Sequence, residues 1–424
     1  MTDFDAEMAY LVDLARAVVE ASRVQPGASV GGYGPNVTGE TLIRPGGRDC
    51  YPAFWVRDFA MSLEADLFTP EEVVHALRLT ASRQAAADWQ TRSGSRVPRG
   101  AIADHITFGG LPIYFPGTLD DYEGQGMPFG RLPSLDDHYY FVEMAWYAVT
   151  RWGRDDLLAE VVDGMPLIER LHRAFGVPKV REATGMVWCE EDDRGVSFGF
   201  TDTVVHTGDL LFCSLLRHRA AGQMAALGVR VGDSGKARHY REIAAQISAH
   251  LTSVFGAESG LLRASTGKSA QPDVWGSAFA VYVGALPAGA TAQVSRALCD
   301  ALAAGTIAWQ GQIRHVPTNA DFSDRTMWES VIGDRPMNRY QNGAYWDTPV
   351  GWVCYAVAQH DQAAARQLAL DYVADLQRDD FRKGPAHGAP WECAHPAGDH
   401  RQNPVYMASV TCPLGAFRRL GWVT

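Results

Sequence analysis

Residues 137–175, DHYYFVEMAWYAVTRWGRDDLLAEVVDGMPLIERLHRAF, contain two kinds of segment in succession. The first, 137–149, is almost wholly apolar, and a helix that is apolar on all sides must be buried on all sides. The second, 154–175, has apolar residues at steps of three and four with charges between them, as in an amphipathic helix. A short link joins the two segments. The stretch therefore predicts a hairpin made of one buried helix and one covering helix.

The same alternation continues along the whole chain. Amphipathic segments are predicted near 5–23, 70–87, 154–174, 235–254, 291–304 and 361–378. Apolar segments lie near 58–68, 136–150, 204–221, 273–286, 347–359 and 404–418. β-Branched runs bounded by turns are few. We therefore expect an all-α protein in which six inner helices are sheathed by six outer helices.

The lengths of the links predict where a site would lie. Links from inner to outer helices are short, as at 69–70, 151–154 and 359–362. Links from outer to inner helices are long, near 25–57, 88–135, 175–203, 255–272, 305–346 and 379–403. If successive helices alternate in direction, every long loop lies at the end where the inner helices start. Long loops in a compact domain usually carry function.

Acidic or amide residues beside aromatics recur at this end of the predicted inner helices. They are Asp58, Asp136, Asp202, Asp273, Asp347 and Asn403, with gaps of 78, 66, 71, 74 and 56 residues. Asp and Asn are good helix N-caps, and capping alone would account for Asp136, Asp273 and Asn403. Capping does not account for the Trp, Tyr and Arg residues that recur beside the six sites. Carboxylates together with indoles suit sugar binding.

The bulk properties bound the class of protein. The 424 residues contain no linker-like spacer, so we expect a single domain over 1–424. A formal charge of −11 argues against a nucleic-acid or anionic-membrane partner. The first twenty residues lack a basic secretory region, and the seven cysteines are dispersed without a CxxC pair, which predicts a cytoplasmic protein. The histidines lack metal-type spacing and no phosphate-binding loop is present, so no metal or cofactor is expected.

The helix alternation and four short motifs resemble the six-hairpin glycosidases, whose fold is an (α/α)6 toroid. The motifs are WVRD at 55–58, GFTDT at 199–203, YQNGAYWD at 340–347 and PWEC at 390–393. The nearest patterns are those of glucoamylases, trehalases, and the group joining processing α-glucosidase I with mannosylglycerate and glucosylglycerate hydrolases. In helix order the resemblance spans nearly the whole chain.

The resemblance implies residues that hold a sugar. An indole stacks on a pyranose face, a guanidinium donates to hydroxyls and a carboxylate accepts from them. These implied binding residues are Trp55, Arg57, Asp58, Tyr340, Gln341, Asn342, Trp346, Asp347 and Trp391. Two alternatives stay open here: an ion pair between Arg57 and Asp58, and helix capping by Asp347.

The resemblance also implies a catalytic pair. Asp202 occupies the place of the general acid, with Phe198 and Phe200 as apolar neighbours that would raise its pKa. Glu392 occupies the place of the base that activates water. Phe replaces an expected Trp before Asp202, so four nearby acids compete for the same role: Glu190, Glu191, Asp192 and Asp193. Weaker candidates for the rim, more often core or cap residues, are Asp136, Asp137, His138, Tyr139 and Trp275.

The sequence thus predicts an inverting glycoside hydrolase that acts on a small α-linked, glucoside-like substrate. A small carbohydrate would be its partner, and the oligomeric state, including a homo-oligomer, is left open. The alternatives are a β-glycosidase or unsaturated-uronyl hydrolase on the same fold, and an epimerase of the N-acylglucosamine type, which uses paired histidines. A carbohydrate-binding protein without activity is the remaining alternative.

Overall fold

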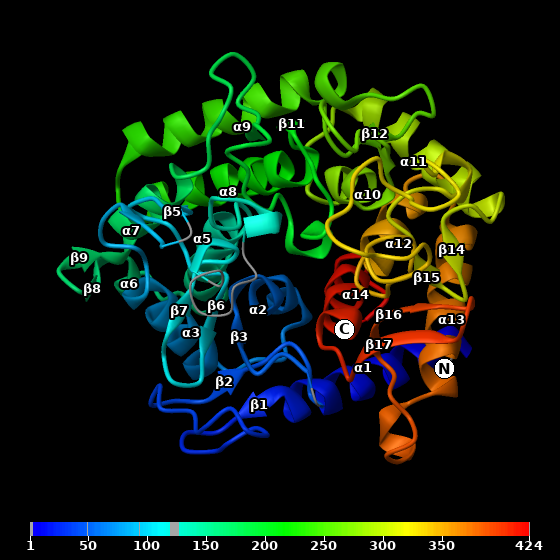
Figure 1. Cartoon of the computed structure of the whole chain (residues 1–424), viewed down its shortest axis with the longest axis horizontal. Helices are drawn as coiled ribbons and strands as arrows, with labels where there is room; N and C mark the ends of the chain where they lie inside the picture. Colours follow the sequence, from blue (N-terminus) through cyan, green and yellow to red (C-terminus); the bar gives the residue numbers. More distant parts are fainter. Residues whose placement is uncertain (1–2, 49, 93, 119–126, 424) are drawn as a thin grey trace.

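Six buried helices close into a ring in the computed structural model, which describes residues 3–48, 50–92, 94–118 and 127–423 (Figure 1). The ring consists of α2 (Val56–Ser62), α5 (Asp137–Trp152), α8 (Leu211–Arg230), α10 (Val274–Tyr282), α12 (Val350–Ala358) and α14 (Ala408–Arg419). Each helix packs against the next in this order, and α14 packs against α2, which closes the ring. These segments are buried on most of their surface, as their apolar composition requires.

A second layer of amphipathic helices covers the ring. It consists of α1 (Asp3–Ser22), α3 (Pro70–Ser82), α7 (Leu167–Phe175), α9 (Ser234–Phe255), α11 (Ala288–Ala303) and α13 (Gln362–Arg378). α3 and α7 pack on α5, α9 packs on α8, α11 packs on α10 and α12, and α1 packs on α14 and α13. The predicted (α/α)6 toroid is confirmed. Within the described ranges, no helix has the length and apolar character needed to cross a membrane.

Two predicted helices differ from the observed ones. The segment predicted at 204–221 becomes helical only at Leu211, because the residues before it form β11 (Gly208–Asp209), which pairs with β10 (Trp188–Cys189). The segment predicted at 154–174 breaks after α6 (Asp156–Ala159) into a hairpin of β8 (Val161–Val162) and β9 (Met165–Pro166). Asp163 and Gly164 form its turn with φ angles of 45° and 79°. Asp-Gly is a strong signal for such a turn, and it overrides the helical period here.

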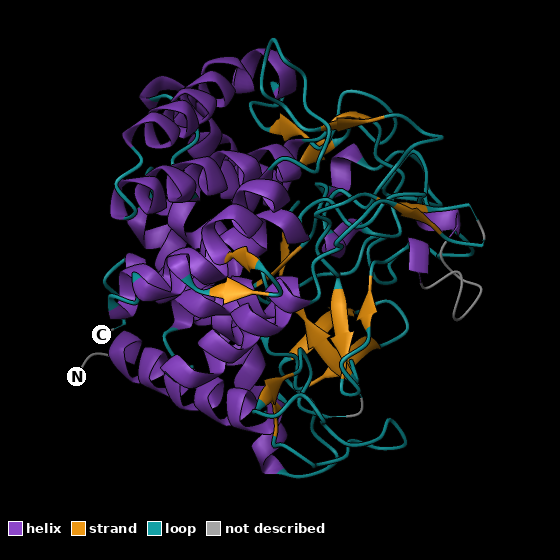
Figure 2. Cartoon of the chain, turned by 90° about the vertical axis from the view of Figure 1, so that its left-hand side faces the viewer, coloured by secondary structure: helices purple, strands orange, loops and turns teal. Residues whose placement is uncertain are grey.

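The long loops carry short antiparallel strands and lie on the face opposite the main body of helices (Figure 2). A three-stranded sheet joins β3 (Ala53–Trp55), β6 (His105–Thr107) and β7 (Pro112–Ile113), and a longer hairpin joins β16 (Trp391–His395) to β17 (His400–Pro404). The remaining pairs are β1 (Arg23–Val24) with β2 (Leu42–Ile43), β4 (Trp89–Gln90) with β5 (Arg96–Val97), β12 (Leu262–Arg263) with β13 (Pro272–Asp273), and β14 (Ala308–Trp309) with β15 (Gln312–Ile313). This pairing fixes the loops above the starts of the ring helices.

A polar cluster ties the ring helices together away from their first turns. One member comes from each ring helix or its extension: Glu64, Glu143, Arg219, Tyr282, Tyr355 and Arg419. Nη2 of Arg219 donates to Glu64 at 2.7 Å and to Glu143 at 2.6 Å, and the hydroxyl of Tyr282 donates to Glu64. The guanidinium of Arg419 lies 4.6 Å from the ring centre of Tyr282 and 5.1 Å from that of Tyr355. The cluster therefore links all six ring helices.

We expect Arg219→Met to lower the free energy of unfolding by about 3 kcal/mol, because it leaves Glu64 and Glu143 with an uncompensated charge inside the ring. Urea unfolding followed by circular dichroism measures this loss. Arg230→Met is the matched control, since Arg230 lies on the same helix in an exposed pair with Asp155 and should cost less than about 1 kcal/mol. An equal decrease in the free energy of unfolding in both variants would show that the cluster does not stabilise the ring.

Candidate active site

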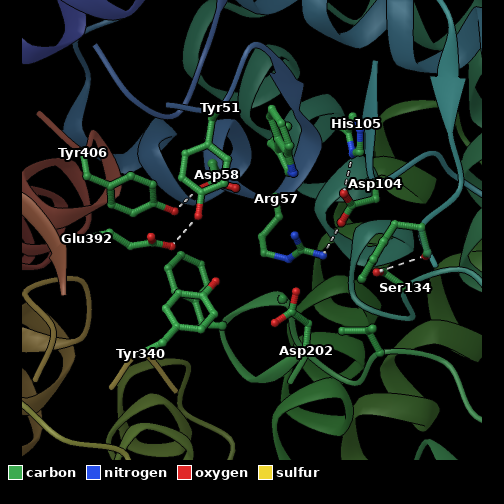
Figure 3. A pocket seen from close by; sticks show the side chains of 15 residues that line it. Tyr51, Arg57, Asp58, Asp104, His105, Ser134, Asp202, Tyr340, Glu392 and Tyr406 are labelled. Atoms are coloured by element: carbon green, nitrogen blue, oxygen red, sulfur yellow. Dashed lines mark hydrogen bonds and ion pairs between the residues drawn. The ribbon is translucent and has the colours of Figure 1, made fainter. Parts of the chain in front are cut away.

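A cavity of about 190 Å³ opens on the loop face above the ring (Figure 3). Its walls come from segments far apart in the sequence: Tyr51, Trp55, Arg57, Asp58, Asp104, His105, Phe115, Ser134, Val196, Gly199, Phe200, Asp202, Tyr340, Glu392 and Tyr406. Six of the predicted site residues are among them, namely Trp55, Arg57, Asp58, Asp202, Tyr340 and Glu392. The long loops before the ring helices thus do converge on one place.

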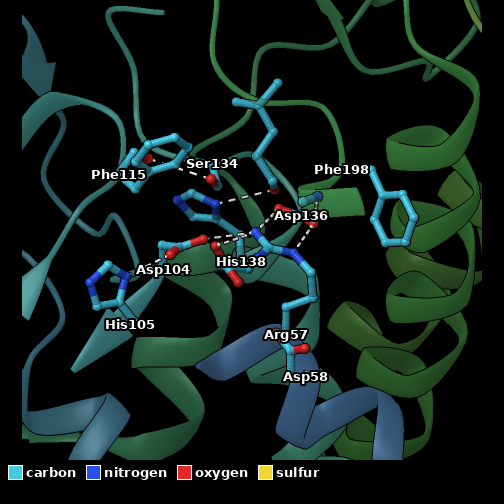
Figure 4. Close-up of polar contacts among 12 residues, drawn as sticks. Arg57, Asp58, Asp104, His105, Phe115, Ser134, Asp136, His138 and Phe198 are labelled. Carbon is cyan, nitrogen blue, oxygen red and sulfur yellow. Dashed lines mark hydrogen bonds and ion pairs between the residues drawn. The ribbon is translucent and has the colours of Figure 1, made fainter. Parts of the chain in front are cut away.

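Arg57 is the centre of a buried network of carboxylates beneath the cavity (Figure 4). Its side chain, 5% exposed, donates from Nε and Nη2 to the two oxygens of Asp136 at 2.6 and 3.0 Å. Nη2 also contacts Asp104 at 2.9 Å and Asp137 at 3.2 Å. Asp136 in addition accepts from the backbone N–H of Gly199 at 3.0 Å. This bidentate pair joins α2 to α5 and to the turn that precedes Asp202.

The network corrects two expectations. Capping alone is wrong for Asp136, whose side chain makes no cap hydrogen bond and instead binds Arg57 and Gly199. The ion pair considered between Arg57 and Asp58 is not among the described contacts of the chain, since Arg57 faces other carboxylates. Asp58 accepts instead from the hydroxyl of Tyr406, and burial raises the pKa of Asp58 to about 6.

Asp202 follows the short 3₁₀ turn η3 (Gly199–Thr201) and lines the cavity. Burial raises its pKa to about 6. The side chain of Gln341 accepts from the backbone N–H and hydroxyl of Thr203 at 2.8 and 2.7 Å and donates to the carbonyl of Gly199 at 3.1 Å. Gln341 therefore binds the backbone on both sides of Asp202, which fixes the position of the Asp202 carboxyl.

The competing acids before this turn lie elsewhere. Glu190, Glu191 and Asp192 are exposed or partly exposed, and Asp193 forms ion pairs with Arg96 and Lys179. None of the four lines the cavity. Asp202 is therefore the carboxyl of this segment that lines the cavity.

Glu392 lies on β16 with 2% of its surface exposed and receives two hydrogen bonds. The hydroxyl of Tyr51 donates to one oxygen at 2.6 Å, and Nδ2 of Asn403, on β17, donates to the other at 2.5 Å. Burial raises the pKa of Glu392 to about 8, although both hydrogen bonds favour the ionised form. Capping is wrong for Asn403, because α14 begins only at Ala408 and the amide holds Glu392.

Three other motif residues lie behind the cavity wall and do not line it. Asn342 accepts from the backbone N–H of Met327 at 2.8 Å and donates to the carbonyl of Arg335 at 2.7 Å. Trp346 is fully buried, with its ring centre 5.7 Å from that of Phe200. Gln341 holds the Asp202 turn. The amides of Gln341 and Asn342 thus hydrogen-bond to the protein behind the cavity wall and hold that wall in place.

Two further predicted binding residues also lie outside the cavity lining. Nε1 of Trp391 donates to Asp379 at 2.7 Å. Asp347 is buried two residues before Pro349, the N-cap of α12, and its side chain makes no cap hydrogen bond, so capping is wrong for Asp347 as well. Asp273 behaves as expected, because its carboxylate accepts from the backbone N–H of Gly276 at 3.0 Å and caps α10.

Several cavity residues went unnoticed in the sequence: Tyr51, Asp104, His105, Ser134 and Tyr406. Asp104 and His105 reach the site because β6 pairs with β3, which sets His105 opposite Trp55. Strands of three residues leave no readable period. Tyr406 was visible only as the aromatic neighbour of Asn403.

No known family model matches the sequence, and no curated protein matches it. Solved structures do resemble the fold. A rhamnosidase from Klebsiella oxytoca with rhamnose bound has a TM-score of 0.60 at 12% identity, and the match covers 99% of this chain but 65% of that one. A glycosidase variant in complex with glucose has a TM-score of 0.58 at 13% identity, with full coverage of both chains. A mannosylglycerate hydrolase of family GH63 from Thermus thermophilus, in complex with glucose, has a TM-score of 0.55 at 13% identity over 96% of this chain and 99% of its own. The chain therefore has the fold of the six-hairpin glycosidases.

Asp347 is a buried carboxyl whose two oxygens have no hydrogen-bond partner among the described residues. Burial, together with the nearby charge of Asp375, raises its pKa well above the usual range. The native state therefore holds a proton here that the unfolded chain releases at lower pH. Stability contributed by this group falls as pH rises from the unfolded pKa of Asp, near about 4, towards the raised native pKa.

We expect Asp347→Asn to be more stable than the natural protein at pH 8 and to differ little from it at pH 4. Between these values the natural protein should lose up to about 1.4 kcal/mol per pH unit relative to the variant. Thermal unfolding across this pH range measures the difference. Asp300→Asn, a change at an exposed position, should leave the pH dependence unaltered. A variant that follows the natural protein at every pH would contradict the assignment.

Proposed function

We propose that this protein is an inverting glycoside hydrolase that acts on a small α-linked, glucoside-like substrate. The observation that carries the proposal is the presence of two carboxyls on different walls of one cavity, Asp202, which is half-buried, and Glu392, which is buried (Figure 3). Acid and base on either side of a glycosidic bond are what inversion requires. The fold shared with glycosidases, including structures that hold rhamnose or glucose, supports the same reaction.

In the proposed reaction Asp202 is the acid. Its proton passes to the glycosidic oxygen as the bond from that oxygen to the anomeric carbon breaks. Burial keeps this carboxyl protonated more readily than an exposed one. A water molecule attacks the opposite face of the anomeric carbon, and Glu392 takes its proton. The product is a sugar of inverted anomeric configuration.

The base is distinguished from the acid by its hydrogen bonds. Tyr51 and Asn403 donate to both oxygens of Glu392, which favours the ionised carboxylate and fixes its direction. Oδ1 of Asp202 is buried without a hydrogen-bond partner in the described part of the chain. Burial raises the pKa of Asp202 to about 6, which is below the value of about 8 for Glu392, so the reacting form, with the proton on Asp202, is the minor one of the two singly protonated forms of the pair.

The cavity favours a small substrate. Its volume of about 190 Å³ is below the roughly 300–1,000 Å³ of sites for drug-sized ligands. One sugar ring, with Trp55 as a stacking surface and Asp58 as an acceptor, fits this scale. The glucose present in two of the similar structures supports a glucoside.

Specific observations disfavour the alternatives. An epimerase of the N-acylglucosamine type needs two histidines in its site, and His105 is the one histidine that lines this cavity among the described residues. An unsaturated-uronyl substrate would need a cation to bind its carboxylate, and the guanidinium of Arg57 in the cavity lining is already bonded to three carboxylates of the protein. A carbohydrate-binding protein would leave a glycoside unchanged, so product analysis separates it from a hydrolase.

We expect kcat/KM for a small α-glucoside to be nearly constant between pH 6 and 8 and to fall about tenfold per pH unit beyond each limit. The active state holds one proton on the Asp202–Glu392 pair, whose pKa values lie near about 6 and about 8. Below pH 6 both groups are protonated, and above pH 8 both are ionised. Initial rates over pH 4–10 test this, and a profile with one limb would contradict a two-carboxyl mechanism.

Replacing each carboxyl separately tests the roles. Asp202→Asn should lower the hydrolysis of α-glucosides by about 10²–10⁴-fold yet spare α-glucosyl fluoride, because fluoride leaves without a proton. Glu392→Gln should lose activity on both substrates, since attack by water still needs a base. Asp300→Asn, which changes an exposed acid remote from the cavity, should be fully active.

Two results would contradict the proposal. Full activity of Asp202→Asn or Glu392→Gln on α-glucosides would remove that residue from its role. Proton NMR of the first-formed product should show the β-anomer, and an α-anomer would exclude inversion.

A further inference from the structure

A chain of charged contacts runs from the core of the ring to the wall of the cavity (Figure 4). Asp136 holds Arg57, and Nη2 of Arg57 donates to Oδ1 of Asp104 at 2.9 Å. Oδ2 of Asp104 then faces Nδ1 of His105 at 2.7 Å. His105 is the last member of this chain and lines the cavity. Its imidazole is therefore positioned by groups that are themselves fixed in the core.

Asp104 sets the tautomer of this imidazole. Although burial acts to raise it, the pKa of Asp104 is held below the usual range by the charge of Arg57 and the hydrogen bond from His105. An ionised carboxylate has only acceptors, so Nδ1 of His105 must carry the proton and donate it. In the neutral imidazole the other nitrogen, Nε2, is then an acceptor.

The ring plane of His105 is fixed as well. β6 sets His105 directly opposite Trp55 of β3. The two rings stack with centres 4.4 Å apart and planes inclined by 18°. Nδ1 is occupied by Asp104, and Nε2 makes no hydrogen bond to any described residue. One acceptor of known orientation is thus left beside an indole on the same cavity wall.

We propose that Nε2 of His105 accepts a hydrogen bond from one hydroxyl of a neutral sugar ring stacked in the cavity, and that Asp104 is the positioning residue that makes it an acceptor. This inference rests on the proposed glycosidase function and adds a specificity-determining residue to it. Other groups on the cavity walls that can accept a hydrogen bond are the carboxyls of Asp58, Asp202 and Glu392. A ligand rich in donating hydroxyls matches this wall, whereas a sugar carboxylate does not.

The test measures binding and does not depend on catalysis. Isothermal titration calorimetry is carried out with glucose, mannose, galactose and rhamnose, and then with each monodeoxy form of the tightest binder. For the intact protein, removal of one particular hydroxyl should weaken binding about tenfold, because Nε2 is left without a donor. In His105→Phe, which keeps a ring against Trp55 but has no nitrogen, that penalty should vanish. The penalties for the other hydroxyls should remain.

Asp104→Asn tests the positioning role. An amide can donate to Nδ1 and so no longer fixes the tautomer. The penalty for the same hydroxyl should shrink, while the penalties for the other hydroxyls stay as in the intact protein. A merely structural effect would weaken all the sugars together. His360→Ala, at an exposed position, is the control and should change none of them.

The outcomes separate this inference from the proposed function. The role of His105 is overturned if removing each hydroxyl weakens binding by the same factor in His105→Phe as in the intact protein. It is also overturned if none of the four sugars binds. Should His105→Phe fail to fold, His105→Ala takes its place in the same comparison. Hydrolysis of an aryl α-glucoside is measured in parallel. If the glycoside is hydrolysed but the loss of affinity on removing a hydroxyl does not depend on His105, this inference alone is rejected. If that loss depends on His105 but no glycoside is hydrolysed, the proposed function alone is rejected.

Discussion

The pairing of Arg57 with Asp136 is the contact on which the rest of the site depends. A guanidinium this deeply buried is stable only when it is paired, and here it meets three carboxylates. Through Asp136 it fixes α5 and the backbone of Gly199, three residues before Asp202. Through Asp104 it fixes His105. One cation therefore sets the relative positions of Asp202, His105 and the first ring helices.

Much of the fold could be predicted because burial leaves a clear mark on sequence. Helices covered on all sides are apolar throughout, and the alternation with amphipathic helices sufficed for the toroid. The site was harder, because a motif names residues without showing where their side chains point. Gln341 and Asn342 have the amides of sugar-binding residues, yet they bind the protein backbone. The sequence predicts a helix cap at Asn403, yet its amide reaches across a hairpin to Glu392. His105 depends on strand pairing that three-residue strands do not reveal.

Aromatic side chains of the ring helices α8 and α10 stack on one another inside the ring. The rings of Phe198, Phe212 and Phe279 stack in succession, with centres 3.7 and 4.8 Å apart. The cluster around Arg219 lies further along α8, which also carries Phe212 near its start. Around the cavity, Glu392 is buried and Asp202 is half-buried. This burial is the first cause of the raised pKa of both Asp202 and Glu392.

A low local dielectric constant favours the protonated form of a carboxyl, which has opposite consequences for an acid and for a base. It helps an acid, which must hold a proton near neutral pH, and it opposes a base, which must be ionised there. Hydrogen bonds from Tyr51 and Asn403, donors supplied by two separate loops, oppose this effect at Glu392 without cancelling it, because the pKa of Glu392 is still raised to about 8. Asp202 has its surrounding turn fixed by Gln341 and needs no such pair of donors at its carboxyl. Glu392 is buried and Asp202 is half-buried, and the two carboxyls also differ in the donors around them, so residues outside the recognised motifs influence how the motif residues can react.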